Sequence, residues 1–466
     1  MTLLIILFSI ASAVWMVPLL TYGRTIILAT MVLLVGTVFG PEFLSIPAPI
    51  PITLDRVLWL AMFGLVLVRF RQGELVLSRL SRIDIAIVLL MAWLLVSAVM
   101  GGPGPKENSP IARWLFYVAM PIGMYAVVRV SEITANDMKW VERLLLALGL
   151  YLSITAILEV SGLHGLVFPR YIVNGKIWEF FGRARGPLLN PSGNAVIMTI
   201  SLVVAMLGFI QSNHRVKLFY AGLSTLILAG IYCTLTRSAW MGGIAAVAVI
   251  VWVYSPRWLR VLGLVSMLLL GAAGAAGLKD QFMQMKRDKN LSAADAEKSV
   301  QLRPLLAIVA WEMFKERPIL GHGFGHYLEY SEPFHTVRTY GVPLDQARPY
   351  TQHNIFLSIL VDAGLVGLFL FLGILTITTA VSWQMVNDKG KSQMARHAGF
   401  IWLGGFAGYA CNGMFQDVTM IPMSNMFMFF TAALAITIYN RSLNAKPIAC
   451  PPVTISGTGF PVTVLR

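Results

Sequence analysis

Long apolar runs recur from one end of the chain to the other, each close to the roughly 20 residues that a helix needs to cross a bilayer. Charged residues, prolines and glycines separate the runs, so each run predicts one membrane-spanning helix. The predicted spans are residues 3–20, 25–40, 54–70, 83–100, 113–128, 140–160, 191–210, 218–235, 239–254, 261–278, 353–383, 397–416 and 421–439. The first two are short enough to form one hairpin, so twelve or thirteen helices are expected. The pattern predicts an all-α, polytopic membrane protein.

Composition supports this class. Only 12% of the 466 residues are charged and 57% are hydrophobic, whereas a soluble domain carries roughly 25% charged residues. The first twenty residues lack a basic start and a small-residue cleavage site, so we expect a retained helix there. The three cysteines are far apart and lack metal-ligand spacing, so neither a metal site nor a disulfide framework is expected.

Lysine and arginine are distributed unequally between the two sides of the predicted bundle. Alternating spans place eighteen of them on the side of residues 69–82 and eight in the short loops opposite. The positive-inside rule makes the richer side cytoplasmic. The long loop 279–352 is therefore expected outside, and the tail 441–466, rich in Pro, Thr, Ser and Gly, is expected to be disordered and cytoplasmic. The net charge of +14 follows this bias and gives no reason to expect a nucleic-acid partner.

Three arginines of the outer side lie beside or between apolar spans. Arg183 and Arg185 precede the span at 191–210, and Arg237 occupies a turn of a few residues between two spans. A guanidinium at that depth requires an anionic partner, and its planar fork suits a phosphate group. The alternative is that these side chains only reach up to the lipid headgroups.

The outer loop carries its own pattern. Apolar residues recur at helical spacing over residues 301–316, which predicts an amphipathic helix on the outer interface or over the bundle. The closely set glycines of residues 321–325 predict a tight loop, since without a preceding strand they indicate no nucleotide site.

The segment that begins at His353 has the most informative pattern. His353, Gly364 and Gly367 fall on one face at helical spacing, so another helix is expected to approach along that face. The positive end of the helix dipole and nearby arginines favour a neutral imidazole, the form that a general base requires near pH 7. The alternative is a histidine that caps the helix or contacts a headgroup.

Other ionisable residues indicate less. Asp362 within the membrane is open to a proton relay or, preferably, a hydrogen bond to a neighbour, and Glu159 is equally open. The three loop histidines lack accompanying carboxylates or thiols and are expected to be structural rather than metal ligands: His322, His326 and His335.

At this point the sequence resembles the O-antigen ligase and polysaccharide polymerase superfamily of bacterial inner membranes. Four segments carry the resemblance: Arg185 to Pro191, the Thr-Arg-Ser turn at Arg237, the Pro-Ile-Leu-Gly-His-Gly run at 318–323, and His-Asn, nine residues, then Gly-x-x-Gly from His353. The resemblance is best over 180–385. It implies a GT-C-like helical fold, with N-terminal helices in 1–180 and a ligase-like core in 181–440.

The resemblance also implies a reaction. An undecaprenyl-diphosphate carrier donates its glycan to an acceptor hydroxyl at the periplasmic face of the inner membrane, without a metal or another cofactor. His353 would take the acceptor proton and Arg237 would bind the diphosphate. The other implied substrate-binding residues are Arg183, Arg185, Asn354 and Arg348. The acceptor would be a glycan, the lipid A core of lipopolysaccharide or a protein.

Two alternatives remain beside ligation. A polymerase would use the same chemistry to join lipid-linked repeat units. A membrane transporter is disfavoured because the cations gather on one face and no internal repeat is visible, whereas transporters place ionisable residues near the midplane of paired repeats.

Overall fold

The computed structural model describes residues 23–46, 52–75, 80–102, 109–273, 293–348 and 350–444. The predicted span at 3–20, the start of the outer loop at 279–292 and the tail from 445 onward lie outside these residues. Helix α17 runs on to Asn444, so the first residues of the predicted tail are helical.

The helices follow the apolar runs closely. In chain order they are α2 (Thr25–Phe39), α3 (Leu54–Arg71), α4 (Arg82–Met100), α5 (Pro110–Trp114), a π-helical turn η2 (Leu115–Ala119), α6 (Met120–Val130), α7 (Ala135–Val160), α8 (Pro191–Gln211), α9 (His214–Cys233), α10 (Arg237–Tyr254), α11 (Arg257–Ala273), α13 (Ala293–Glu316), α14 (Tyr327–Tyr330), α15 (Ile355–Asn387), α16 (Gln393–Gly413) and α17 (Pro422–Asn444). Two short strands, β1 (Ser45–Ile46) and β2 (Ile52–Thr53), pair antiparallel between α2 and α3.

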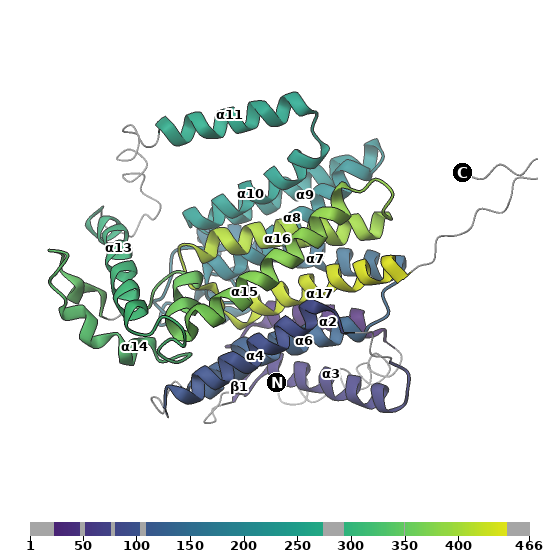
Figure 1. Ribbon diagram of the computed structural model, residues 1–466. Helices are drawn as coiled ribbons and strands as arrows, with labels where there is room; N and C mark the ends of the chain where they lie inside the picture. The colour runs from purple at the N-terminus through teal and green to yellow at the C-terminus, as the bar shows by residue number, and fades with distance from the viewer. Residues whose placement is uncertain are drawn as a thin grey trace, which may run out of the picture.

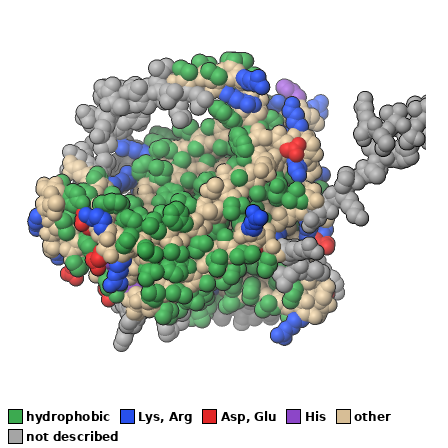
Figure 2. All heavy atoms as spheres, in the orientation of Figure 1, with side chains coloured by type: hydrophobic (Ala, Val, Ile, Leu, Met, Phe, Trp, Pro, Cys, Tyr) green, Lys and Arg blue, Asp and Glu red, His purple; other side chains and the backbone are tan. Residues whose placement is uncertain are grey.

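Eight of the described helices are long and apolar enough to cross a membrane. Helices α3, α11 and α16 coincide with further predicted spans, and α2 is a shorter apolar helix. The all-α, polytopic membrane class is therefore confirmed, while the total of twelve or thirteen spans stays a prediction. Figure 2 shows hydrophobic side chains over the middle of one face, with most charged side chains toward its two ends.

The long helices lie side by side, and α8 and α17 are the most enclosed of them (Figure 1). Helix α8 packs against α7, α9, α10 and α16, and α17 packs against α6 and α16. Helix α13 lies crosswise at one end of this bundle, close to α14 and the start of α15. We call this the α13 end; it also holds the first residues of α3, α8, α10 and α17.

The predicted amphipathic helix is confirmed in α13. Its apolar residues Leu302, Leu305, Leu306, Val309 and Met313 are buried. They pack with the short 3-10 turns of the same loop, η6 (Glu332–Thr336) and η7 (Leu344–Ala347), and with Val361 of α15. Because both α13 and the turns bury apolar side chains there, the described part of the loop forms a packed cap on the bundle.

Helix α15 is broken at Gly364, where φ is 66° and ψ is −167°. The prediction that His353 and Gly364 share one helical face is therefore wrong, because the helical register does not continue through Gly364. Gly364 is approached by a loop rather than by a helix: a Cβ there would lie 2.1 Å from the carbonyl oxygen of Ile319. Gly367, one turn further on, lies against Trp93 of α4.

The loop that fills this break is the Pro318–Gly323 segment singled out in the sequence. The amides of His322 and Gly323 donate to the carbonyls of Val361 and Asp362 at 2.9 Å, and the amide of Leu365 donates to Pro318. Gly364 leaves these carbonyls without helical partners, and the loop supplies donors in their place.

Candidate active site

His353 lies at the α13 end, directly before the cap of α15. Its φ of 49° is unusual for a residue with a side chain. Asn354 is the cap: its side-chain oxygen accepts from the amides of Phe356 (2.9 Å) and Leu357 (3.1 Å), and its side-chain nitrogen donates to the carbonyl of Met414 (3.0 Å). Asn354 therefore fixes where His353 sits, and its described hydrogen bonds go to the protein.

The surroundings of His353 lower the pKa of its imidazole from the ordinary 6.5. Burial is the largest cause and the charge of Arg303 adds to it, while the carboxylate of Asp417 opposes both. The predicted direction toward a neutral imidazole is confirmed. Burial is its main cause and Arg303 contributes, whereas the sequence pointed to the helix dipole and nearby arginines.

Sequence reasoning missed both Arg303 and Asp417. Arg303 projects from α13, with its guanidinium 5.4 Å from the ring centroid of Phe415. Asp417 is buried in the turn between α16 and α17 and caps the 3-10 turn η8 (Val418–Met420) by accepting from the amide of Thr419 at 3.1 Å. Arg303 carried one signal, a cation at the apolar start of an amphipathic helix, whereas Asp417 carried none.

Arg237 is the first residue of α10 and follows a turn in which Leu235 has a φ of 49°. Arg183 lies beside this turn: its guanidinium donates to the carbonyl of Thr234 at 3.3 Å and to the hydroxyl of Thr236. Two of the predicted phosphate-binding arginines are thus brought to one turn, residues 234–237, which we call the arginine turn. Backbone strain at such positions is typical of functional sites.

The end of α16 joins this turn to His353. The hydroxyl of Ser238, next to Arg237, donates to the side-chain oxygen of Asn412 at 3.1 Å. Two residues further on, the carbonyl of Met414 holds Asn354. Segment 412–417 therefore contacts the arginine turn through Ser238 and the histidine through Asn354.

Arg185 is 1% exposed, and the described hydrogen bonds of its guanidinium lie within its own loop rather than at that turn. Its guanidinium donates to four main-chain carbonyls of one loop, those of Ile172 (2.9 Å), Asn174 (3.0 Å), Ile177 and Glu179 (2.9 Å). These contacts point to a positioning role, since a guanidinium spread over four carbonyls organises the loop around itself.

Glu159 completes this arrangement from the last turn of α7. Its two carboxylate oxygens accept from the amides of Arg185 (3.1 Å) and Gly186 (3.0 Å). The question left open for Glu159 in the sequence has a structural answer: it anchors the loop that carries Arg183 and Arg185.

The remaining expected residues lie further from these contacts. Arg348 is exposed at the end of η7, where its charge acts on His335 and Asp345. The three loop histidines are buried and hydrogen-bonded, for example His322 to the carbonyl of Met313 at 2.7 Å, as expected of structural residues. Within the described part of the chain, no group of three or more His, Cys, Asp or Glu is placed to hold a metal ion.

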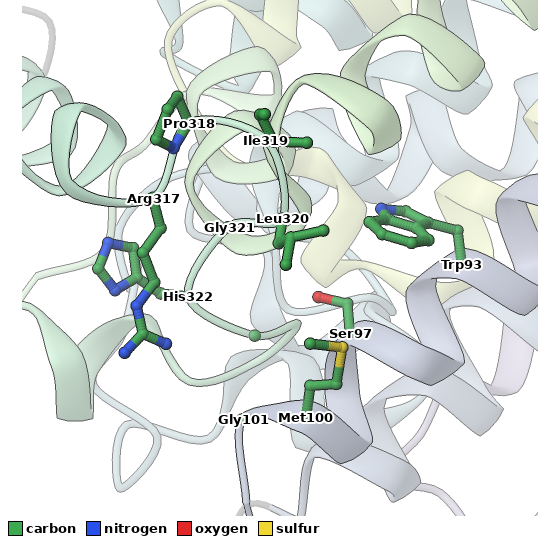
Figure 3. A pocket seen from close by; sticks show the side chains of 11 residues that line it. Trp93, Ser97, Met100, Gly101, Arg317, Pro318, Ile319, Leu320, Gly321 and His322 are labelled. Atoms are coloured by element: carbon green, nitrogen blue, oxygen red, sulfur yellow. The ribbon is translucent and has the colours of Figure 1, made fainter.

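A separate cavity of about 560 Å³ lies between α4 and the loop 317–323. Figure 3 shows Trp93, Ser97 and Met100 of α4 facing Leu320 across it, with Arg317 to one side. Its lining is mostly apolar, and neither His353 nor Arg237 lines it.

The segment from α9 to the middle of α15, residues 221–372, matches a family model described as O-antigen ligase. This segment contains Arg237, Arg303 and His353. Residues 221–372 are thus similar to O-antigen ligases. The resemblance to the O-antigen ligase and polymerase superfamily is confirmed, which supports a ligase-like or polymerase-like function in polysaccharide biosynthesis. Arg183 and Asp417 reach the site from outside the matched segment. No curated protein matches the chain.

Proposed function

We propose that the protein transfers a glycan from an undecaprenyl-diphosphate carrier to an acceptor hydroxyl. The observation that carries the proposal is the position of His353, which is joined through the end of α16 to the turn of Arg237. Burial and Arg303 lower the pKa of its imidazole, which favours the neutral form. A base and a cationic site for a leaving group are the two elements that this displacement needs.

The reaction balances with protein groups alone. The acceptor oxygen forms a bond to the anomeric carbon of the glycan while the bond from that carbon to the diphosphate oxygen breaks. The acceptor proton goes to the imidazole of His353, and the bonding electrons leave with the lipid diphosphate. Arg237 and Arg183 neutralise the charge that develops on the diphosphate, without a metal ion.

The other residues support this arrangement. Arg303 keeps the imidazole neutral and adds a cation near the diphosphate, and Asn354 sets the position of His353. Arg185 holds the loop that carries Arg183. Arg348 stays a proposed contact to the substrate further out on the loop.

The charge bias of the sequence supports an orientation in the bacterial inner membrane. The α13 end then faces the periplasm and the chain's C-terminal end is cytoplasmic. A lipid-borne donor reaches the arginine turn sideways from the bilayer, which accounts for guanidinium groups at the depth of a membrane surface.

The test is transfer by the purified full chain in nanodiscs, with an undecaprenyl-diphosphate oligosaccharide and a panel of acceptors. His353→Ala is expected to reduce kcat by about 10²–10⁴-fold, the usual contribution of a general base. His164→Ala is the matched control, because that histidine is exposed on another loop. Transfer at the unaltered rate by His353→Ala would overturn the assignment of the base.

Arginine variants test the diphosphate site. Arg237→Lys and Arg237→Ala are both expected to lose about 10²–10³-fold in kcat if the planar fork holds the diphosphate, while Arg338→Lys, an exposed substitution, should change little. Nearly full activity of Arg237→Lys would indicate headgroup contact only. Loss of activity in EDTA would contradict the metal-free mechanism. The acceptors that the protein uses in this assay distinguish a ligase from a polymerase.

A further inference from the structure

A second cavity at the α13 end, of about 330 Å³, has a lining suited to a polar ligand. It lies between the start of α3, the turn η2, the loop 179–190 and the start of α17. Its volume is at the lower end of the roughly 300–1,000 Å³ of small-molecule sites. The polar residues Thr53, Asp55 and Tyr117 line it together with the aromatic rings of Phe116 and Phe180.

Two oxygen atoms of this lining lack a hydrogen-bond partner among the described residues. Thr53 is only 5% exposed, and its hydroxyl is unpartnered. The Oδ1 atom of Asp55 is likewise buried and unpartnered. Burying such groups without hydrogen bonds costs free energy, which a bound ligand would recover. The hydroxyl of Thr53 can donate or accept a hydrogen bond, and the Oδ1 atom of Asp55 can accept one. A ligand with two neighbouring hydroxyl groups could bond to both.

The charges and rings of the cavity favour a neutral ligand. The lining residues include two acidic ones, Asp55 and Glu179, and one basic one, Arg56, so a diphosphate would meet a net negative surrounding. The guanidinium of Arg56 lies over the ring of Phe116, 3.5 Å from the ring centroid. These two planar groups provide a flat surface. A pyranose ring presents hydroxyl groups at its edge and apolar C–H groups on its faces, and it fits both features.

Hydrogen bonds connect two walls of the cavity to elements of the candidate active site. On one side Arg185 holds the carbonyl of Glu179 at 2.9 Å, within the loop whose Arg183 reaches the arginine turn. On the other side the side chain of Asn425 donates to the carbonyls of Tyr117 (3.1 Å) and Thr419 (2.8 Å), in the turn that Asp417 caps.

We propose that this cavity is a sugar-binding subsite that holds a neutral pyranose residue of a glycan substrate through Thr53 and Asp55. The proposal rests on the proposed function in taking a glycan as the natural ligand. It adds the N-terminal helices, which lie outside the matched family segment, to the substrate-binding part of the protein.

Sugar binding can be measured without any transfer reaction. The probes are methyl pyranosides of glucose, galactose, mannose and N-acetylglucosamine, titrated by saturation-transfer NMR against the full chain in nanodiscs prepared without sugar detergents. At least one probe should bind saturably, and inorganic pyrophosphate should not displace it. Thr53→Val and Asp55→Asn should each weaken that binding tenfold or more, whereas Thr53→Ser should bind as the unaltered protein does.

Matched controls separate loss of the site from loss of the fold. Thr37→Val removes a buried hydroxyl that is bonded within α2, and Glu74→Gln neutralises an exposed carboxylate near the other end of α3; both should bind normally. The proposal is overturned if no pyranoside binds, or if both Thr53→Val and Asp55→Asn bind the pyranoside as tightly as the unaltered protein does. In the transfer assay, Asp55→Asn should raise the KM for one glycan substrate tenfold and change kcat less than threefold. A chain inactive with every lipid-linked donor would refute the proposed function, and sugar binding would still decide this proposal.

Discussion

Replacing Arg185 by lysine should loosen the loop at residues 170–186 while the helix bundle stays intact. The guanidinium of Arg185 donates to four carbonyls, and Glu159 accepts from the main-chain amides of Arg185 and Gly186. An ammonium has three donors and no fixed fork. One of the four carbonyls therefore lacks a donor, and because the planar fork is gone we expect a second bond to be lost as well. Each lost bond from a charged donor costs about 1.5–3 kcal/mol, so two lost bonds cost at least about 3 kcal/mol. That cost raises the open fraction of the loop about 100-fold.

Hydrogen exchange read by mass spectrometry measures this opening. The loop amides of Asn174, Ile177 and Gly186 are hydrogen-bonded and should exchange about 100-fold faster in Arg185→Lys, while amides of α8 and α16 stay unchanged. Arg183→Lys is the control, since Arg183 makes none of the four carbonyl contacts. If Arg185→Lys abolishes transfer while the loop amides keep their protection, the guanidinium acts on the substrate and the positioning argument is refuted.

Two further predictions test the imidazole and the break in α15. Asp417 raises the pKa of His353, so Asp417→Asn should lower that pKa further and move the acid limb of kcat/KM to lower pH; a shift to higher pH would contradict the electrostatics. Gly364→Ala should lower the midpoint of thermal unfolding, because the Cβ would lie 2.1 Å from a carbonyl oxygen at a φ of 66°. A side chain in that conformation costs about 1–3 kcal/mol by itself. Gly373→Ala, in the same helix with open space around it, should be neutral, and an equal loss in both variants would refute the argument.

The helices could be predicted because bilayer length and hydrophobicity are local properties of the sequence. Arg237 and His353 could be identified from the same pattern, since each is a polar residue at the end of an apolar run. Arg303 and Asp417 could not be found in this way. Each lies near His353 only through the packing of α13 and of the turn after α16, and neither proximity leaves a periodic signal.

Backbone conformation and loop contacts account for the other differences between the predicted and the observed site. The spacing of His353, Gly364 and Gly367 assumes a continuous helix, and a single positive φ at Gly364 removes that assumption. Arg183 and Arg185 look equivalent in the sequence, being two residues apart in one loop. Glu159 accepts hydrogen bonds from the amides of Arg185 and Gly186 but belongs to a different element of the chain. Its carboxylate and the carbonyls of the loop together explain why the guanidinium of Arg185, rather than that of Arg183, is buried.

The contacts around His353 argue that the matched segment 221–372 is not a complete active site. The carbonyl that holds Asn354 and the ring beneath Arg303 belong to residues 414 and 415. The guanidinium of Arg183 reaches the arginine turn from the loop before α8. The proposed roles of His353 and of the turn at Arg237 thus depend on groups outside residues 221–372. Substitutions in the loop before α8 and in the turn after α16 should therefore impair the proposed transfer, although both places lie outside the matched segment.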